Sequence, residues 1–191
     1  MHKYHSPISI PNFFTLLRII LTPLFVIFLL RDQFTWALAV FAIAGISDGL
    51  DGLIARFFNQ RTALGAYLDP TADKLLLISA YIGLAVLNVV PAWVSVIVIS
   101  RDVIIILGIA IFTLTQKSYG VHPTMLSKCT TTAQILTVML SLFDPDQGRL
   151  ALFHIPVLWT TAVLTMLSGL QYVYIGMSFL QEPNESEKNG P

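Results

Sequence analysis

The sequence predicts an all-α protein, an integral membrane bundle of six transmembrane helices, from its composition and from the spacing of its apolar residues. Of the 191 residues, 55% are hydrophobic and only 12% are charged, whereas about a quarter of the residues in a soluble domain are charged. The apolar runs are too numerous to be buried in one small globule. Six runs approach the length of about 20 residues that crosses a bilayer. We therefore expect one multi-pass membrane domain at 1–181 and a disordered polar tail at 182–191.

Each expected helix is set off by residues that commonly interrupt helices. A charged break follows Leu30, a polar break follows Phe58, and Pro91 separates the third helix from the fourth. A polar segment closed by Pro123 precedes the fifth helix, and a segment rich in Asp, Pro and Gly precedes the sixth. The helices bounded in this way are expected at 12–30, 35–58, 63–89, 92–115, 124–143 and 154–181.

Six spans place both ends of the domain on one side of the membrane. Lysine and arginine are more frequent on that side, and the side richer in these residues is normally cytoplasmic. We therefore expect cytoplasmic termini and a cytoplasmic turn between the second and third helices. The formal net charge is zero, so nothing indicates a nucleic-acid partner. The side of the termini carries Lys3, Arg56, Arg61, Lys117 and Lys188, and the other side carries Arg31 and Arg149.

Four aspartates interrupt the second and third expected helices: Asp48, Asp51, Asp69 and Asp73. A carboxylate at membrane depth is costly, so four of them within one helical hairpin require an explanation. Residues three or four apart share a helix face, so each helix presents two of these carboxylates together. At a rise of about 1.5 Å per residue, the two pairs lie at a similar depth below the turn. The spacing therefore predicts that the four carboxylates converge.

Four clustered carboxylates repel one another unless cations neutralise them. Two divalent ions would neutralise them, and a ligand set made only of oxygen favours Mg²⁺ and then Mn²⁺. Such a pair of ions is suited to holding a diphosphate. The alternative is a set of buried ion pairs with Arg56, Lys74 and Arg101, which does not explain why the acids share helix faces.

Gly52, Gly65 and Arg56 lie beside the acids. A glycine lets a phosphate or nucleotide approach the helix backbone closely, although small residues also serve tight helix packing in membranes. Arg56, one turn beyond Gly52, is placed to bind a phosphate in a bidentate manner; the alternative is an arginine that extends to the lipid headgroups. Intramembrane acids also indicate a divalent-cation transporter. An arginine beside the acids does not help a cation to pass, whereas it helps to bind a diphosphate. The residues therefore favour a diphosphate site.

Together these residues match, position by position, the motif of the CDP-alcohol phosphotransferase family, which the chain resembles over nearly its whole length. The resemblance implies transfer of a phosphatidyl group from CDP-diacylglycerol to a hydroxyl acceptor, with release of CMP. It implies a homodimer, and it leaves open a bacterial plasma membrane or a mitochondrial inner membrane. The matching residues are Asp48, Asp51-Gly52, Ala55-Arg56, Gly65, Asp69 and Asp73.

The resemblance also implies roles for the matched residues. The first three aspartates bind the metal pair with Asp73 close to it, and Asp73 is the general base that takes the proton of the acceptor hydroxyl. Gly52, Arg56 and Gly65 contact the CDP moiety. Two further residues, in an opening segment similar to that of phosphatidyl-transferring members, share a helix face and reach the nucleotide, with a helix-start cap as the alternative role. They are Asn12 and Thr15.

The acceptor is less constrained, because cardiolipin synthases and phosphatidylglycerophosphate synthases have similar openings and hairpins. Two later segments, Ile99 to Asp102 and Pro123 to Lys128, look like the cardiolipin synthase pattern. These segments contain two cations, Arg101 and Lys128. So small a positive charge suits the singly charged phosphodiester of phosphatidylglycerol better than the free phosphate of glycerol-3-phosphate. We expect Arg101 and Lys128 to bind phosphatidylglycerol, with glycerol-3-phosphate as the alternative acceptor. The alternative roles of these cations are an internal Arg101–Asp102 ion pair and a lysine that reaches the headgroups.

Overall fold

The structure, a computed structural model, describes residues 10–58, 63–114, 124–148 and 150–181, and their side chains at 16–47, 74–108, 124–148 and 150–178. The described residues form six α-helices and no strand, which confirms the all-α prediction. The tail expected at 182–191 lies outside them. In chain order the helices are α1 (Ile10–Leu30), α2 (Phe34–Phe58), α3 (Ala63–Val86), α4 (Ala92–Leu114), α5 (Met125–Phe143) and α6 (Ala151–Gln181).

Helix α3 ends at Val86, before the expected end at 89. Asn88 has a left-handed backbone with a φ of 59°, a conformation in which asparagine is enriched. The amide of Val89 donates to the carbonyl of Leu84 at 2.9 Å, and the amide of Asn88 donates to the carbonyl of Ala85 at 3.1 Å. These two hydrogen bonds form a Schellman motif, which satisfies carbonyls at the end of a helix and stops it.

Helix α6 begins at Ala151, earlier than the expected start at 154. The buried Asp144 carboxylate accepts hydrogen bonds from the amides of Gly148 at 3.2 Å and Leu150 at 2.6 Å. The carbonyl of Leu150 in turn accepts the amide of Phe153 at 2.8 Å. A carboxylate that binds amides ahead of a helix stabilises its first turn, so α6 starts directly after the segment that Asp144 organises.

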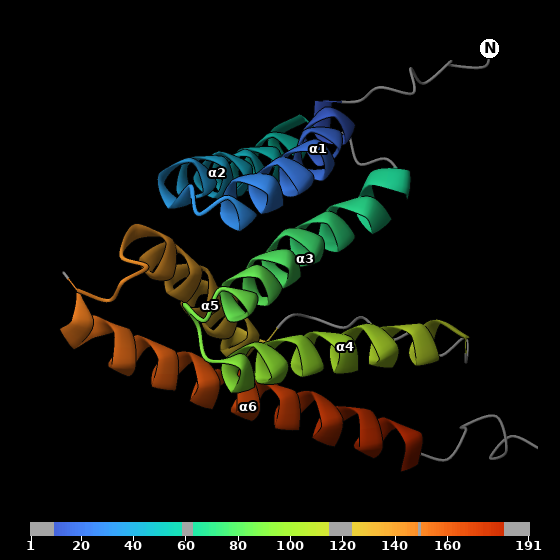
Figure 1. Ribbon diagram of the computed structural model, residues 1–191. Coiled ribbons are helices and arrows are strands. Elements are labelled where there is room, and N and C mark those ends of the chain that lie inside the picture. The colour runs from blue at the N-terminus through green and yellow to red at the C-terminus, as the bar shows by residue number, and fades with distance from the viewer. Residues whose placement is uncertain (1–9, 59–62, 115–123, 149, 182–191) are drawn as a thin grey trace, which may run out of the picture.

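The helices pack in two groups that share α3 and α5 as their connection. Helix α1 packs along α2 and α3, and helix α6 packs along α4 and α5. Figure 1 shows the α1–α2 pair above and the α4–α6 pair below, with α3 and α5 between them. The chain runs back and forth, so the turns after α1 and α5 lie toward one end of the bundle, on the left of Figure 1. The last residues of α2 and the first residues of α3 lie toward the opposite end.

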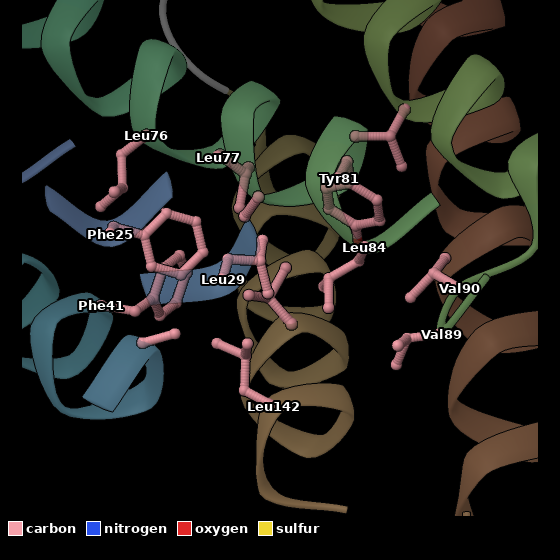
Figure 2. Close-up of a cluster of buried hydrophobic side chains, with 14 of the residues drawn as sticks. Phe25, Leu29, Phe41, Leu76, Leu77, Tyr81, Leu84, Val89, Val90 and Leu142 are labelled. Atoms are coloured by element: carbon pink, nitrogen blue, oxygen red, sulfur yellow. The ribbon is translucent and has the colours of Figure 1, made fainter. Parts of the chain in front are cut away.

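The hydrophobic core takes side chains from all six helices, with the largest share from α2 and α3 (Figure 2). The rings of Phe25 and Phe41 pack with their centroids 5.7 Å apart. Leu29, Leu84 and Leu142 fill the space between the helices and are 0%, 0% and 1% exposed. Gly83 allows the close approach of α3 to α1, because a Cβ atom there would overlap the side chain of Leu29. Apolar packing therefore joins all six helices.

Helices α5 and α6 meet through polar side chains instead. The hydroxyl oxygens of Thr137 and Thr161 lie 2.7 Å apart. The side-chain amide of Gln134 donates to the hydroxyl of Thr165 at 3.2 Å. All four side chains are buried. Hydrogen bonds between helices support association where the surroundings offer no aqueous partners, so this interface is held by polar contacts along its length.

The described surface carries many large apolar side chains. Ile46, Val96 and Leu152 are 63%, 61% and 81% exposed, and exposed apolar surface of this kind marks contact with lipid or with another protein. Within the described side chains, one segment, Ala151–Ser178, is long and apolar enough to cross a membrane. Shorter apolar stretches lie at Leu16–Leu30, Phe34–Ser47 and Lys74–Val86. The six-span arrangement therefore stays a prediction.

Candidate active site

The four motif aspartates lie on helical backbone. Asp48 and Asp51 belong to α2, and Asp69 and Asp73 belong to α3. Both helices are uninterrupted at these positions, so spacings of three and four residues put each pair on one face of its helix. The convergence of the four carboxylates stays a prediction, because their side chains lie outside the described ones.

The residues expected to contact the nucleotide belong to the same two helices and to α1. Asn12 and Thr15 lie in α1, Gly52 and Arg56 in α2, and Gly65 in α3. Helix α1 packs along both acid-bearing helices. Among the described side chains, no group of three His, Cys, Asp or Glu residues is placed to hold a metal ion, and the four motif aspartates are not among those side chains.

Three charged side chains, which we call the Asp102 cluster, meet between α3 and α4. Lys74, the residue after Asp73, donates a hydrogen bond to Oδ1 of Asp102. Nη1 of Arg101 donates to the same oxygen at 2.7 Å. Asp102 is 0% exposed and Arg101 is 3% exposed. The cluster combines two cations with one carboxylate, so it carries an excess positive charge.

The guanidinium group of Arg101 also connects α4 to α5 and α6. Its Nη2 donates to Oγ of Ser127 at 2.6 Å and to Oγ of Ser168 at 3.0 Å. Its carbon lies 5.8 Å from the centre of the Tyr172 ring, within the range of a cation–π contact. Arg101 is therefore held inside the protein by side chains from two neighbouring helices.

The two cations expected at the acceptor differ in accessibility. Arg101 is buried and forms the internal ion pair with Asp102 that was its alternative role. Lys128 is exposed in the first turns of α5 and follows Ser127, the partner of Arg101, in the chain. Both cations therefore belong to one region, and of the two only Lys128 presents its side chain at the surface. Acceptor binding by either residue stays a prediction.

The Asp102 cluster bears on the alternative in which cations neutralise the four motif aspartates. That alternative requires Arg56, Lys74 and Arg101, and the last two are bonded to Asp102. The side chain of Arg56 lies outside the described ones. With these two cations bonded to Asp102, four carboxylates that converge as predicted would need further positive charge. Their donor atoms are all oxygen, which fits hard divalent cations.

The bond between Lys74 and Asp102 and the surroundings of Arg101 were not predicted from the sequence. The sequence does contain a pattern that predicts part of this arrangement. Polar residues recur at intervals of three and four along α5 and again along α6. Such spacing marks one face of a helix, and in apolar helices it predicts a polar interface between them. The recurring residues are Ser127, Thr130, Gln134, Thr137 and Ser141 on α5, and Thr161, Thr165, Ser168 and Tyr172 on α6.

Comparison with known proteins identifies relatives over most of the chain. A family model described as CDP-alcohol phosphatidyltransferase matches residues 8–173. The human cardiolipin synthase (CMP-forming) is 34% identical over 195 residues, which cover 93% of this chain and 65% of that protein. A probable phosphatidylglycerophosphate synthase of Mycobacterium tuberculosis is 34% identical over 172 residues, which cover 86% of this chain and 80% of the relative. The CDP-diacylglycerol-glycerol-3-phosphate 3-phosphatidyltransferase of Bacillus subtilis is 34% identical over 182 residues, covering 86% and 93%.

These relatives are named for different activities. The chain spans 65% of the length of the human cardiolipin synthase and also of the rat protein. The identity is 34% to the human enzyme and 34% to the B. subtilis enzyme, so identity does not separate the two acceptors. The family model covers α1 to α5, most of α6 and every position of the aspartate motif. The chain belongs to the CDP-alcohol phosphatidyltransferase family.

Proposed function

We propose that the protein is an enzyme that transfers the phosphatidyl group of CDP-diacylglycerol to a hydroxyl acceptor and releases CMP. The observation that carries this proposal is the complete aspartate motif on α2 and α3 in a chain of this family. The names of the human and B. subtilis relatives support the donor and the leaving group. Membership of this family favours an enzyme over the divalent-cation transporter that intramembrane acids also indicate.

The motif aspartates Asp48, Asp51, Asp69 and Asp73 would hold two Mg²⁺ or Mn²⁺ ions. When bound, such ions supply the positive charge that a diphosphate and its leaving group require. The same-face spacing and the all-oxygen donor set support this assignment. It is also supported by the engagement of Lys74 with Asp102, since that cation is not left to neutralise the motif aspartates.

The other motif residues bind the substrates and move the proton. Gly52 and Gly65 leave the helix backbones open to the CDP moiety, and Arg56 binds a phosphate through charge-assisted hydrogen bonds. Asp73 takes the proton of the acceptor hydroxyl while the hydroxyl oxygen bonds to the lipid-side phosphorus. The bond from that phosphorus to the bridging oxygen breaks, and CMP leaves with the electron pair.

Phosphatidylglycerol is the acceptor that we favour, which makes cardiolipin the product. Arg101 is buried against Asp102, so the exposed Lys128 is the accessible member of the expected pair. One accessible cation suits a singly charged phosphodiester better than a free phosphate. Glycerol-3-phosphate is the second candidate, because the chain covers 93% of the B. subtilis relative that is named for it.

The same proposal places the six helices across a membrane with the active site on the side of the termini. Helices of 19 to 31 residues extend about 28–46 Å, enough for a hydrocarbon core of about 30 Å. Trp36, Trp93 and Trp159 are all exposed, and the rings of the last two lie 5.3 Å apart; exposed tryptophans are typical of a membrane interface. The bacterial plasma membrane, the mitochondrial inner membrane and the homodimer rest on family resemblance alone.

The proposal is tested by identifying the product. The purified protein is incubated with CDP-diacylglycerol and Mg²⁺, with phosphatidylglycerol and glycerol-3-phosphate offered separately. CMP release is measured, and the lipid product is identified by mass spectrometry. We expect cardiolipin and CMP with phosphatidylglycerol. Phosphatidylglycerophosphate instead would uphold the donor chemistry and reverse our choice of acceptor, whereas no CMP with either acceptor would contradict the proposed function.

A further inference from the structure

Helix α3 has two chemically different sides near its middle. Asp69 and Asp73 lie about 40° apart around the helix axis, and Lys74 lies about 120° from the direction midway between them. Lys74 is bonded to Asp102 of α4. The rotation of α3 about its own axis therefore sets both the direction of its aspartate-bearing face and the reach of Lys74 to α4.

The contact between Lys74 and Asp102 is a costly way to hold two helices together. Asp102 is fully buried, and its Oδ2 accepts no hydrogen bond from the residues that the structure describes. A buried carboxylate oxygen without a donor lowers stability, and apolar residues of similar volume often pack as well or better. The carboxylate is fixed in place nevertheless, because Arg101 on its Oδ1 is itself bonded to Ser127 and Ser168.

We propose that Asp102 is a positioning residue, which fixes the rotation of α3 through Lys74 and so keeps the Asp69–Asp73 face in register with α2. The inference rests on the proposed function, and it assigns no substrate contact to Lys74 or Asp102. The anchor is rigid because α4, α5 and α6 meet at Arg101. A displacement of about 1 Å at a reacting group can lower a rate about 100-fold, so a small rotation of α3 affects catalysis strongly.

Lys74→Met tests this proposal with little change in side-chain length. The variant removes the bond from α3 to Asp102 and leaves the Arg101–Asp102 pair intact. We expect kcat to fall about 10- to 100-fold, with the KM for CDP-diacylglycerol unchanged within about twofold, because misorientation affects the transition state more than ground-state binding. Lys74→Arg keeps a donor within reach of the carboxylate and should recover most of the lost kcat.

Ser95→Ala is the matched control, because it removes another buried polar contact between the same two helices. The hydroxyl of Ser95 donates to the carbonyl of Tyr81 at 3.0 Å, away from the aspartates. We expect this variant to lower the thermal midpoint without changing kcat. If Ser95→Ala loses as much kcat as Lys74→Met, the effect is a general loosening of the α3–α4 contact and the positioning role is wrong.

Asp102→Asn is the second variant. It should lower kcat in the same way and reduce stability further, because two cations lose their counter-charge. If the Asp102→Asn variant does not fold, the kcat of Lys74→Met alone tests the positioning role. A Lys74→Met enzyme with wild-type kcat, or with only a raised KM, would overturn the proposal, since the lysine would then have no effect on rate or would contact the substrate.

Hydrogen exchange separates this inference from the proposed function. In Lys74→Met, the α3 amides ahead of residue 74 should exchange faster than in the wild type, while the α6 amides stay unchanged. In Ser95→Ala the amides of this first half of α3 should keep their wild-type rates. A wild-type protein that releases no CMP would contradict the proposed function, whereas unchanged α3 exchange in Lys74→Met would contradict the positioning role.

Discussion

The two halves of the bundle are built from different chemistry. The core half, around Phe25, Leu29, Leu84 and Leu142, consists of apolar side chains packed between helices (Figure 2). The site half, around the Asp102 cluster, buries charged and hydroxyl groups and leaves Oδ2 of Asp102 without a donor among the described residues. Close apolar packing stabilises a fold, whereas a partly satisfied charged cluster is costly. The apolar core therefore stabilises the packing of the helices, whereas the buried charges of the Asp102 cluster add less to stability than apolar packing would.

Helix α3 shows this division within one element. Its second half contributes Leu84 to the core, and its first half bears Asp69, Asp73 and Lys74. Changes in the core half should lower the free energy of unfolding and leave the rate of the folded enzyme unchanged. Changes in the site half should lower kcat, whether or not they also lower stability. The substitutions below compare the two halves.

The largest effect is expected from Asp73→Asn. Loss of the general base should lower kcat about 10²- to 10⁴-fold, while the thermal midpoint stays near that of the wild type because the side-chain shape is kept. CMP release and thermal unfolding are the two measurements. Asp146→Asn, at an exposed position in the turn after α5, is the matched control and should retain full activity. Full activity in Asp73→Asn would remove the general-base assignment.

An intermediate effect is expected from Gly83→Ala in the core half. The added Cβ overlaps Leu29 between α3 and α1, and overpacking of this kind costs about 1–3 kcal/mol. Denaturant or thermal unfolding should show the loss, with kcat of the folded protein unchanged. Gly45→Ala adds a Cβ with no neighbour within 4 Å, so it should leave stability unchanged or raise it by up to about 1 kcal/mol, because alanine favours a helix more than glycine does. Equal stability of the two variants would show that α1 and α3 are not packed as described.

The smallest effect is expected at the polar interface of α5 and α6. A double-mutant cycle with Thr137→Val and Thr161→Val should give a coupling energy of about 0.6 kcal/mol, since interhelical hydrogen bonds in membranes average about that value. The two hydroxyls lie 2.7 Å apart and are buried. The same cycle with Thr132, whose exposed hydroxyl bonds to the carbonyl of Lys128 in its own helix, should give no coupling. An equally large coupling energy with Thr132 would contradict a specific contact between Thr137 and Thr161.

The helices could be predicted from the sequence, because apolar runs and polar breaks are local signals. The expected starts at 35, 63 and 92 lie within one residue of the observed ones. The two larger differences have long-range or conformational causes. Asn88 stops α3 through a left-handed backbone, and Asp144 organises the start of α6 from the preceding helix end.

The site could be predicted only in part for a related reason. Residues three or four apart lie on one face of a helix, so the spacing alone places Asp69 and Asp73 on the same face of α3. The bond from Lys74 to Asp102 joins residues on different helices, and no local pattern places them together. The sequence also allowed two roles for Arg101, acceptor binding and an internal ion pair with Asp102. The structure shows the ion pair, and Ser127 of α5 and Ser168 of α6 hold the guanidinium group in place.

The most direct test of the central claim is CMP release from CDP-diacylglycerol with and without exhaustive chelation of divalent ions. In Mg²⁺, CMP should appear in step with the lipid product; it should disappear on chelation and return when Mg²⁺ or Mn²⁺ is added back. CMP release and lipid product that persist after exhaustive chelation would contradict the assignment of the four aspartates to a metal pair.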